Sequence, residues 1–266
     1  MQVYLNGILT PDALTRIDPS DRGFTLSDGL FETLRVRAGI PQRLDAHLKR
    51  LRAGASLLGL PVPLDDDALT EALISTAAAN GLADAVLRLT LTRGPAPRGL
   101  LPPGSPSPTL LIVAGPPPPP AGPLYAVVAT VTRRNEHSPL SRCKCLAVLD
   151  NVLARREAAE RGAEDAILLN TAGRLAETTI ANLFLVIGGR VMTPPVEEGA
   201  LPGVRRAEVI SRLDAVETPL DPGDLPRAEE AFVTNALGVR PLVAVNERPV
   251  GDGRAGPLTC RLLLPE

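Results

Sequence analysis

The proline run at 115–123 limits the possible folds of this 266-residue chain more than any other feature, and it reads Gly115-Pro-Pro-Pro-Pro-Pro-Ala-Gly-Pro123. Consecutive prolines lack backbone donors and have a fixed φ, so they favour a stiff connector over a helix or a central strand. The chain is also long for a single hydrophobic core. We therefore predict a small α/β domain at 1–115, a linker at 116–122 and a larger domain at 123–266. A surface loop within one domain is the alternative.

The composition is that of a globular protein, with 44% hydrophobic residues, 22% charged residues and a formal net charge of −2. This balance gives no electrostatic attraction to nucleic acid or to an anionic membrane. No apolar run approaches the roughly 20 residues that cross a bilayer, and the N-terminus does not have the pattern of a signal peptide. Three cysteines indicate reduced thiols and a cytoplasmic setting. The Cys143-Lys-Cys145 spacing is not that of a zinc site, so no metal is expected.

Hydrophobic periodicity predicts a mixture of helices and strands, an α+β fold without internal repeats. Apolar residues at helical spacing in 44–59 form one stripe, and His47 and Arg50 lie away from its centre. Gly188-Gly189 predicts a two-residue hairpin turn. The expected strands lie at 3–5, 31–37, 85–92, 109–114, 124–132, 166–169, 181–187 and 190–193, and the expected helices at 44–59, 146–161 and 204–213.

Lys144 is the first candidate for chemistry. A lysine becomes a nucleophile when its amine loses a proton through desolvation or through a neighbouring positive charge. Its neighbours Cys143, Cys145, Leu146 and Ala147 are apolar, which favours burial. A solvated surface lysine is the alternative.

A carboxylate and two polar turns follow. Glu177 can keep a pyridine nitrogen protonated. Gly203 and Val204 open a predicted helix, where backbone N–H groups bind anions. Arg50 can add a bidentate contact, and Thr234-Asn235-Ala236 carries further donors. Together these are the parts that a pyridoxal 5'-phosphate (PLP) enzyme requires, although each alone is more often an ordinary structural feature.

In their order along nearly the whole chain, these segments resemble the class IV aminotransferases, the fold-type IV PLP enzymes. That family includes branched-chain aminotransferases, D-amino-acid aminotransferases and aminodeoxychorismate lyase. Lys144 and Glu177 are separated by 33 positions (177 − 144 = 33), as the family leads one to expect. The matching segments are Asp21-Arg-Gly-Phe24, Ser27-Asp-Gly-Leu-Phe-Glu-Thr33, His47-Leu-Lys-Arg-Leu51, Thr92-Arg-Gly94, Lys144, Glu177-Thr-Thr-Ile-Ala-Asn-Leu-Phe184, Leu201-Pro-Gly-Val204 and Thr234-Asn235.

The resemblance implies a two-domain fold of the D-amino-acid aminotransferase type, with the cofactor between the domains and a homodimer. Lys144 would form the Schiff base and move the Cα proton, and Glu177 would pair with the ring nitrogen. Ala147-Val148 stands where the family often has a polar pair. Arg205 stands where the family has a threonine, which leaves backbone donors and this arginine. The expected phosphate ligands are Arg50, Gly203, Val204, Arg205, Thr234 and Asn235.

The loop at 92–100 resembles the carboxylate-binding loop of D-amino-acid aminotransferases, with Arg98 at the arginine position. Leu100 and Phe31 replace the histidine and tyrosine of that subgroup. With Ala236, Arg98 and Phe31 are the expected substrate-binding residues. The resemblance implies an aminotransferase acting on an amino acid, D-enantiomers included, and a 2-oxo acid. The alternatives are an aminodeoxychorismate lyase, which releases pyruvate and 4-aminobenzoate, and a PLP-free binding relative.

Overall fold

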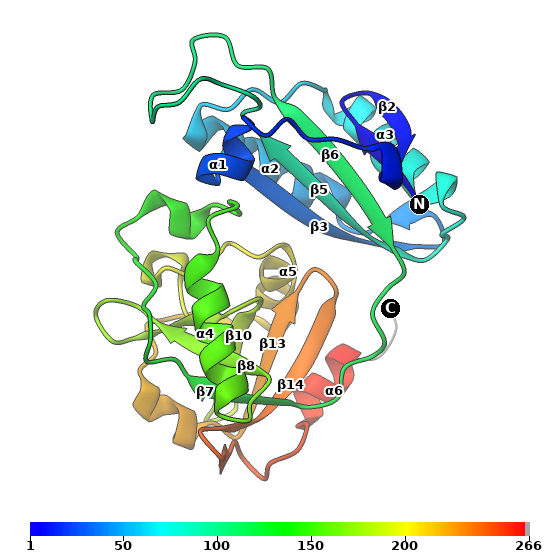
Figure 1. Ribbon diagram of the computed structural model, residues 1–266. Coiled ribbons are helices and arrows are strands. Elements are labelled where there is room, and N and C mark those ends of the chain that lie inside the picture. The colour runs from blue at the N-terminus through cyan, green and yellow to red at the C-terminus, as the bar shows by residue number, and fades with distance from the viewer. Residues whose placement is uncertain (264–266) are drawn as a thin grey trace. The chain divides into compact units, whose positions relative to one another are not determined.

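The computed structural model describes residues 1–263, and the chain divides into two compact units (Figure 1). The first unit contains Met1–Pro118 together with Cys143–Ala147, and the second contains Pro119–Arg142 and the chain from Val148 on. The division therefore falls in the proline run, but one short segment of the later chain packs with the first unit. The sequence alone assigned that segment to the second domain.

The first unit is built on a six-stranded antiparallel sheet in the order β2-β1-β6-β5-β3-β4. Its strands are β1 (Gln2–Leu5), β2 (Ile8–Pro11), β3 (Gly29–Arg37), β4 (Ile40–Pro41), β5 (Ala85–Thr92) and β6 (Thr109–Gly115). Its helices are α1 (Arg22–Leu26), α2 (Leu44–Leu58) and α3 (Asp66–Ala79), with a short 3-10 turn at Asp12–Leu14.

One face of this sheet forms a core with α2 and α3, which lie on the same side of it (Figure 1). Strand alternation buries Leu30 and Leu34 of β3, and helical spacing buries Leu48 and Leu51 of α2, as the periodicity predicts. Helix α3 was not predicted from the sequence, although the Asp65 carboxylate caps it by accepting from the Ala68 N–H. The opposite sheet face, called the Phe31 face below, carries Phe31, Thr33, Arg35, Arg88 and Thr90.

The described residues of the second unit form a nine-stranded sheet in the order β12-β11-β10-β13-β14-β7-β8-β9, with β15 beside β14. Its strands are β7 (Leu124–Val128), β8 (Asp165–Leu169), β9 (Leu175–Thr178), β10 (Asn182–Ile187), β11 (Arg190–Thr193), β12 (Val216–Glu217), β13 (Glu230–Asn235), β14 (Gly238–Val245) and β15 (Arg248–Pro249). Its helices are α4 (Leu149–Glu160), α5 (Val204–Leu213) and α6 (Pro257–Leu263), with 3-10 turns at Pro139–Arg142, Val196–Glu198 and Pro222–Arg227.

An additional pairing between Asn182 and Glu177 joins β10 to β9. It closes the path β10-β13-β14-β7-β8-β9 into a ring. Asn182 also pairs with Thr234 of β13, so Glu177, Asn182 and Thr234 lie side by side on three adjacent strands. Directly paired residues share one face of a sheet, so this register gathers three polar side chains.

The predicted helix at 146–161 is shorter than expected, because α4 begins at Leu149. Residues 143–147 are instead extended against β3: the Phe31 N–H donates to the Lys144 carbonyl at 2.9 Å, and the Leu146 N–H donates to the Gly29 carbonyl at 3.0 Å. The larger apolar side chains of α4 do not form its buried face. Leu149 is 75% exposed, and the small side chains of Ala154 and Ala158 are the buried ones. Strand β7 ends at Val128, earlier than predicted.

None of the helices among residues 1–263 combines the length and the apolar character that crossing a membrane requires.

Candidate active site

Lys144 lies on the Phe31 face of the first unit. Its neighbours Cys143 and Cys145 both point into the core on the other side of the sheet. Since side chains alternate along an extended chain, the side chain of Lys144 emerges on the opposite side. Its Nζ lies 4.2 Å from the centroid of the Phe31 ring, and the guanidinium carbon of Arg88 lies 4.0 Å from the same centroid.

The two cysteines beside Lys144 serve as packing groups. Burial, with smaller contributions from Cys145 and Glu32, raises the pKa of the Cys143 thiol to about 11. The Cys143 thiol is therefore protonated and neutral at physiological pH. These small apolar side chains fix the extended segment that presents Lys144.

Arg50 is held by a buried carboxylate. Its Nε and Nη2 donate to the two oxygens of Glu32 at 2.8 and 2.6 Å, and His47 Nδ1 lies 2.7 Å from the same carboxylate. Glu32 is 1% exposed and His47 is 2% exposed, so His47 is buried although the periodicity places it away from the centre of the apolar stripe. Burial alone would raise the pKa of Glu32, but the hydrogen bonds from Arg50 and His47 lower it below its ordinary value. The guanidinium of Arg50 is therefore fixed in one orientation.

In the second unit, Glu177 is a buried carboxylate that Arg134 and the backbone of Leu201 contact. Arg134 Nη2 lies 3.1 Å from its Oε1, and the Leu201 N–H donates to its Oε2 at 3.0 Å. The Arg134 side chain also bonds the carbonyls of Gly199 and Ser141. A positive charge and a backbone donor stabilise the ionised form of a carboxylate. The site therefore holds a preoriented anion.

The turn before α5 is fixed by side chains from β9 and β10. Glu177 binds the Leu201 N–H, and Asn182 Nδ2 donates to the Leu201 carbonyl at 2.8 Å. Gly203, two residues on, is the N-cap of α5, and the helix has no side-chain cap. A Cβ on Gly203 would overlap Asn182 Oδ1, so a larger residue here would displace the Asn182 amide from the Leu201 carbonyl. The first-turn N–H groups of a helix lack intrahelical acceptors and carry the positive end of the helix dipole.

Thr234 adds an unusual feature on the same face as Asn182. It is 1% exposed, and its hydroxyl has no hydrogen-bond partner among the described residues. Leaving a buried hydroxyl unsatisfied is costly, so such a group calls for a ligand.

The remaining predicted ligands serve local structure. Asn235 Oδ1 accepts from the Leu237 N–H at 2.9 Å and orders the turn between β13 and β14, which includes Ala236. Val204 is the first residue of α5. Arg205 donates to Glu208 on the same helix at 2.7 Å, so at least part of its charge is engaged there.

Arg98 lies on an exposed loop of the first unit. This loop is anchored by buried Arg22, whose guanidinium donates to the carbonyls of Gly99 and Leu100 at 2.8 and 2.9 Å. The Leu100 side chain is 83% exposed. The anchor constrains the backbone next to Arg98 without engaging its side chain.

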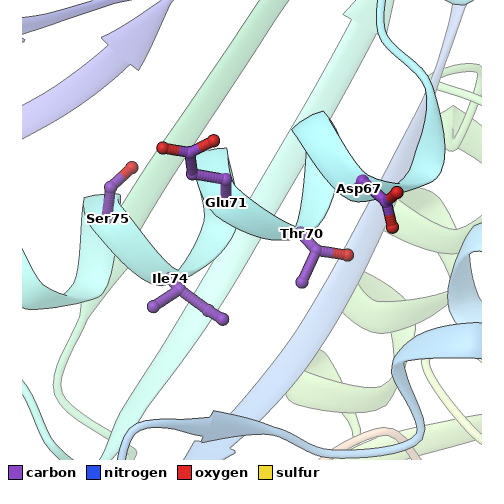
Figure 2. Close-up of a pocket in the computed structure, with 5 residues that line it drawn as sticks. All are labelled: Asp67, Thr70, Glu71, Ile74 and Ser75. Carbon is purple, nitrogen blue, oxygen red and sulfur yellow. The ribbon is translucent and has the colours of Figure 1, made fainter.

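A shallow hollow on α3, drawn in Figure 2, lies apart from these groups. None of the predicted site residues lines it, and it offers a single apolar side chain among short polar ones. Its lining residues are Asp67, Thr70, Glu71, Ile74 and Ser75.

Several residues of these two clusters were not predicted. Glu32 and Arg88 lie on opposite faces of adjacent strands, and their partners are distant in sequence. Arg134 has no distinguishing local pattern. Asn182 was part of a matched segment without an assigned role. In the sequence, the alternation of apolar Cys143 and Cys145 with charged Lys144 was the pattern that could have predicted an extended segment.

Comparison with known proteins identifies the family. The model of the family described as amino-transferase class IV matches residues 29–245. The "Putative branched-chain-amino-acid aminotransferase" of Methanocaldococcus jannaschii is 32% identical over 98% of this chain and 94% of its own. The D-alanine aminotransferase of Bacillus licheniformis is 29% identical over 97% and 93%. The crystal structure of 4-amino-4-deoxychorismate lyase from Pseudomonas aeruginosa aligns with a TM-score of 0.84 and 33% identity over 98% of this chain and 96% of that chain. The chain therefore belongs to the class IV aminotransferases, a family of enzymes that use pyridoxal 5'-phosphate.

Proposed function

We propose that this enzyme is an aminotransferase that moves an amino group between an amino acid and a 2-oxo acid, with Lys144 as the residue that links to the cofactor. The observation that carries the proposal is the position of the Lys144 amine, which lies against an aromatic ring and beside a second cation. The nearby positive charge of Arg88 favours a neutral, nucleophilic amine. When bound, PLP supplies an electron sink for the carbanion at the substrate Cα.

We assign the phosphate to the start of α5. The uncapped helix N-terminus, the enforced glycine at 203 and the unpartnered hydroxyl of Thr234 fit an anion with several acceptor oxygens. Arg50, with its orientation fixed by Glu32, is proposed as a charged ligand of the phosphate, and Val204 and Asn235 as further contacts. Arg205 is assigned a backbone contribution because its side chain pairs with Glu208.

Glu177 is proposed as the partner of the pyridine nitrogen. Arg134 and the Leu201 N–H orient the carboxylate before a ligand arrives, which lowers the ordering cost of binding. Lys144 would accept the proton that the substrate Cα gives up and return it later in the reaction.

For the substrate we propose an amino acid whose carboxylate is bound by Arg98, with Phe31 and Ala236 shaping the site. A D-amino acid is included, because the Bacillus licheniformis relative is a D-alanine aminotransferase. Aminodeoxychorismate lyase is the second candidate. The 33% identity of the Pseudomonas aeruginosa lyase supports it.

We also propose that the enzyme is a homodimer. Phe24, Leu100 and Leu101 of the first unit are 78%, 83% and 88% exposed. Exposed apolar side chains of this size on adjoining segments are typical of protein interfaces. Sedimentation of the wild type and of a Leu101→Glu variant tests this, and a wild-type monomer would contradict it.

The test of function combines spectra with two substrate pairs. Purified protein with PLP should gain a visible absorbance band that Lys144→Ala lacks. D-alanine with 2-oxoglutarate, and separately a panel of L-amino acids, should then yield pyruvate or the matching 2-oxo acid together with glutamate. Release of pyruvate and 4-aminobenzoate from aminodeoxychorismate, without amino transfer from any amino acid, would establish the lyase instead. A protein that stays colourless with PLP would refute both.

A further inference from the structure

We propose that Arg22 fixes the loop that carries Arg98 and so sets the affinity of the enzyme for the substrate carboxylate. This inference rests on the proposed role of Arg98 in substrate binding. It assigns Arg22 as a positioning residue, because its contacts are with the backbone of the loop.

The loop between β5 and β6 is attached at its start through the backbone. The Arg22 N–H donates to the Gly94 carbonyl at 3.0 Å, and the Ala96 N–H donates to the Ser20 carbonyl at 3.3 Å. These two bonds run in opposite directions between the loop and the segment at the start of α1. They fix the loop up to residue 96.

The same arginine attaches the loop a second time, through its side chain. Its Nη1 and Nη2 donate to the carbonyls of Gly99 and Leu100 at 2.8 and 2.9 Å. Residues 97–98 therefore lie between two fixed points, and Arg98 directly precedes the second one. Neither attachment is provided by the exposed side chains of the loop.

Arg22 is itself held in a buried charge cluster. Its Nε donates to Asp28 Oδ2 at 2.8 Å, and Arg93 binds both oxygens of the same carboxylate at 2.7 and 3.0 Å. Arg93 also donates to the carbonyls of Leu58 and Gly59 at the end of α2, at 2.8 and 2.9 Å. Both arginines are 4% exposed. The cluster therefore joins the loop to the end of a core helix.

The charges and the shape of this cluster both require a guanidinium at position 22. Burial acts to raise the pKa of Asp28, but hydrogen bonds from Arg93 and Arg22 lower it below its ordinary value. The carboxylate is therefore ionised and orients Arg22. Each of the three guanidinium nitrogens of Arg22 has an acceptor. A lysine keeps the charge but has one compact head, which lacks this planar fork.

An ordered loop binds a ligand more tightly than a loop that must first become ordered. Side chains and backbone lose conformational entropy when binding immobilises them, and a loop fixed beforehand avoids that loss. Release of the loop around Arg98 should therefore raise KM by roughly tenfold, the cost of ordering one long side chain. The value of kcat should change little, because a contact made equally in the ground state and the transition state affects KM alone.

The test measures kcat and KM of the holoenzyme for D-alanine with 2-oxoglutarate, or for L-leucine if the wild type prefers it. Arg22→Gln and Arg22→Lys should each raise KM by roughly tenfold and leave kcat and the affinity for PLP close to those of the wild type. Arg98→Ala should raise KM at least as much. Arg22→Gln added to Arg98→Ala should change KM little further, because the side chain that Arg22 positions is then absent.

Two arginine variants serve as controls. Arg93→Gln breaks the same buried cluster, but Arg93 donates to the end of α2 and not to the loop, so it should lower stability without a comparable rise in KM. Arg52→Gln removes an arginine from an exposed ion pair with Asp66 and should change neither. Arg22→Lys keeps the buried charge and answers the question if Arg22→Gln does not fold.

Two results would overturn the inference while leaving the proposed function in place. One is a wild-type KM in Arg22→Gln and Arg22→Lys alongside a raised KM in Arg98→Ala. The other is an equal rise in KM in Arg93→Gln, which would mean that any damage to the cluster has this effect. A wild-type KM in Arg98→Ala, or no amino transfer by the wild type, would instead overturn the proposed function and the inference with it.

Discussion

Replacing Glu32 with alanine is expected to be among the most damaging single changes in the first unit. The substitution removes a carboxylate that is 1% exposed and that receives two hydrogen bonds from Arg50 and one contact from His47. The Arg50 side chain is 11% exposed, so its charge stays largely buried after the partner is lost. Removing one partner of a buried ion pair costs about 3–5 kcal/mol.

The assay is thermal or urea unfolding of the apoprotein. A loss of about 3–5 kcal/mol corresponds to a fall in melting temperature on the order of 10 °C, at about 2–4 °C per kcal/mol for a protein of this size. Asp66→Asn is the control, because its ion pair with Arg52 is exposed, at 59% and 36% for the two side chains. An exposed pair contributes less than about 1 kcal/mol.

The acid dependence gives a second readout of the same carboxylate. The pKa of Glu32 in the folded protein is lowered from its ordinary value of 4.5. Its contribution is therefore fully present above pH 4.5 and is lost as the pH falls through the lower folded value. The stability gap between wild type and Glu32→Ala should narrow in that range. If Glu32→Ala loses no more stability than Asp66→Asn at neutral pH, the buried-pair argument is wrong.

Three further outcomes follow from the second unit. Thr234→Val replaces an unpartnered buried hydroxyl by a methyl group, so the stability of the apoprotein should stay unchanged or rise. PLP binding, measured by titration, should weaken about tenfold. Unchanged PLP affinity would show that Thr234 does not belong to the phosphate site. Gly203→Ala should destabilise the protein by about 1–3 kcal/mol and reduce its PLP affinity, because the new Cβ would overlap the Asn182 amide oxygen. Gly223→Ala is the control: it has open space around it and should change neither stability nor PLP affinity. Burial acts to raise the pKa of Glu157, but hydrogen bonds from backbone N–H groups lower it to about 2. Glu157→Gln should therefore reduce the stability that the protein loses between pH 4.5 and 2, and substitution of the exposed Glu160 by Gln is the control.

Local patterns were sufficient where an element is specified by its own residues. The stripe of α2 and the bounds of α5 followed from helical spacing and, for α5, from the Leu-Pro-Gly start. The hairpin at Gly188-Gly189 followed from the two glycines, which adopt φ values of +57° and +71°. The family was indicated by the resemblance of ordered segments along nearly the whole chain, which include the lysine, the carboxylate and the glycine turn.

Tertiary structure alone decided the surroundings of these groups. The extended segment of Lys144 exists because β3 supplies its backbone partners, and Phe31 and Arg88 reach its amine through strand register. The line of Glu177, Asn182 and Thr234 likewise arises from pairing across three strands. Such contacts depend on which strands become neighbours, and a one-residue change of register would turn every side chain to the other face. Sequence therefore determined which groups can react, and the pairing of distant strands determined which charges and hydrogen bonds tune them.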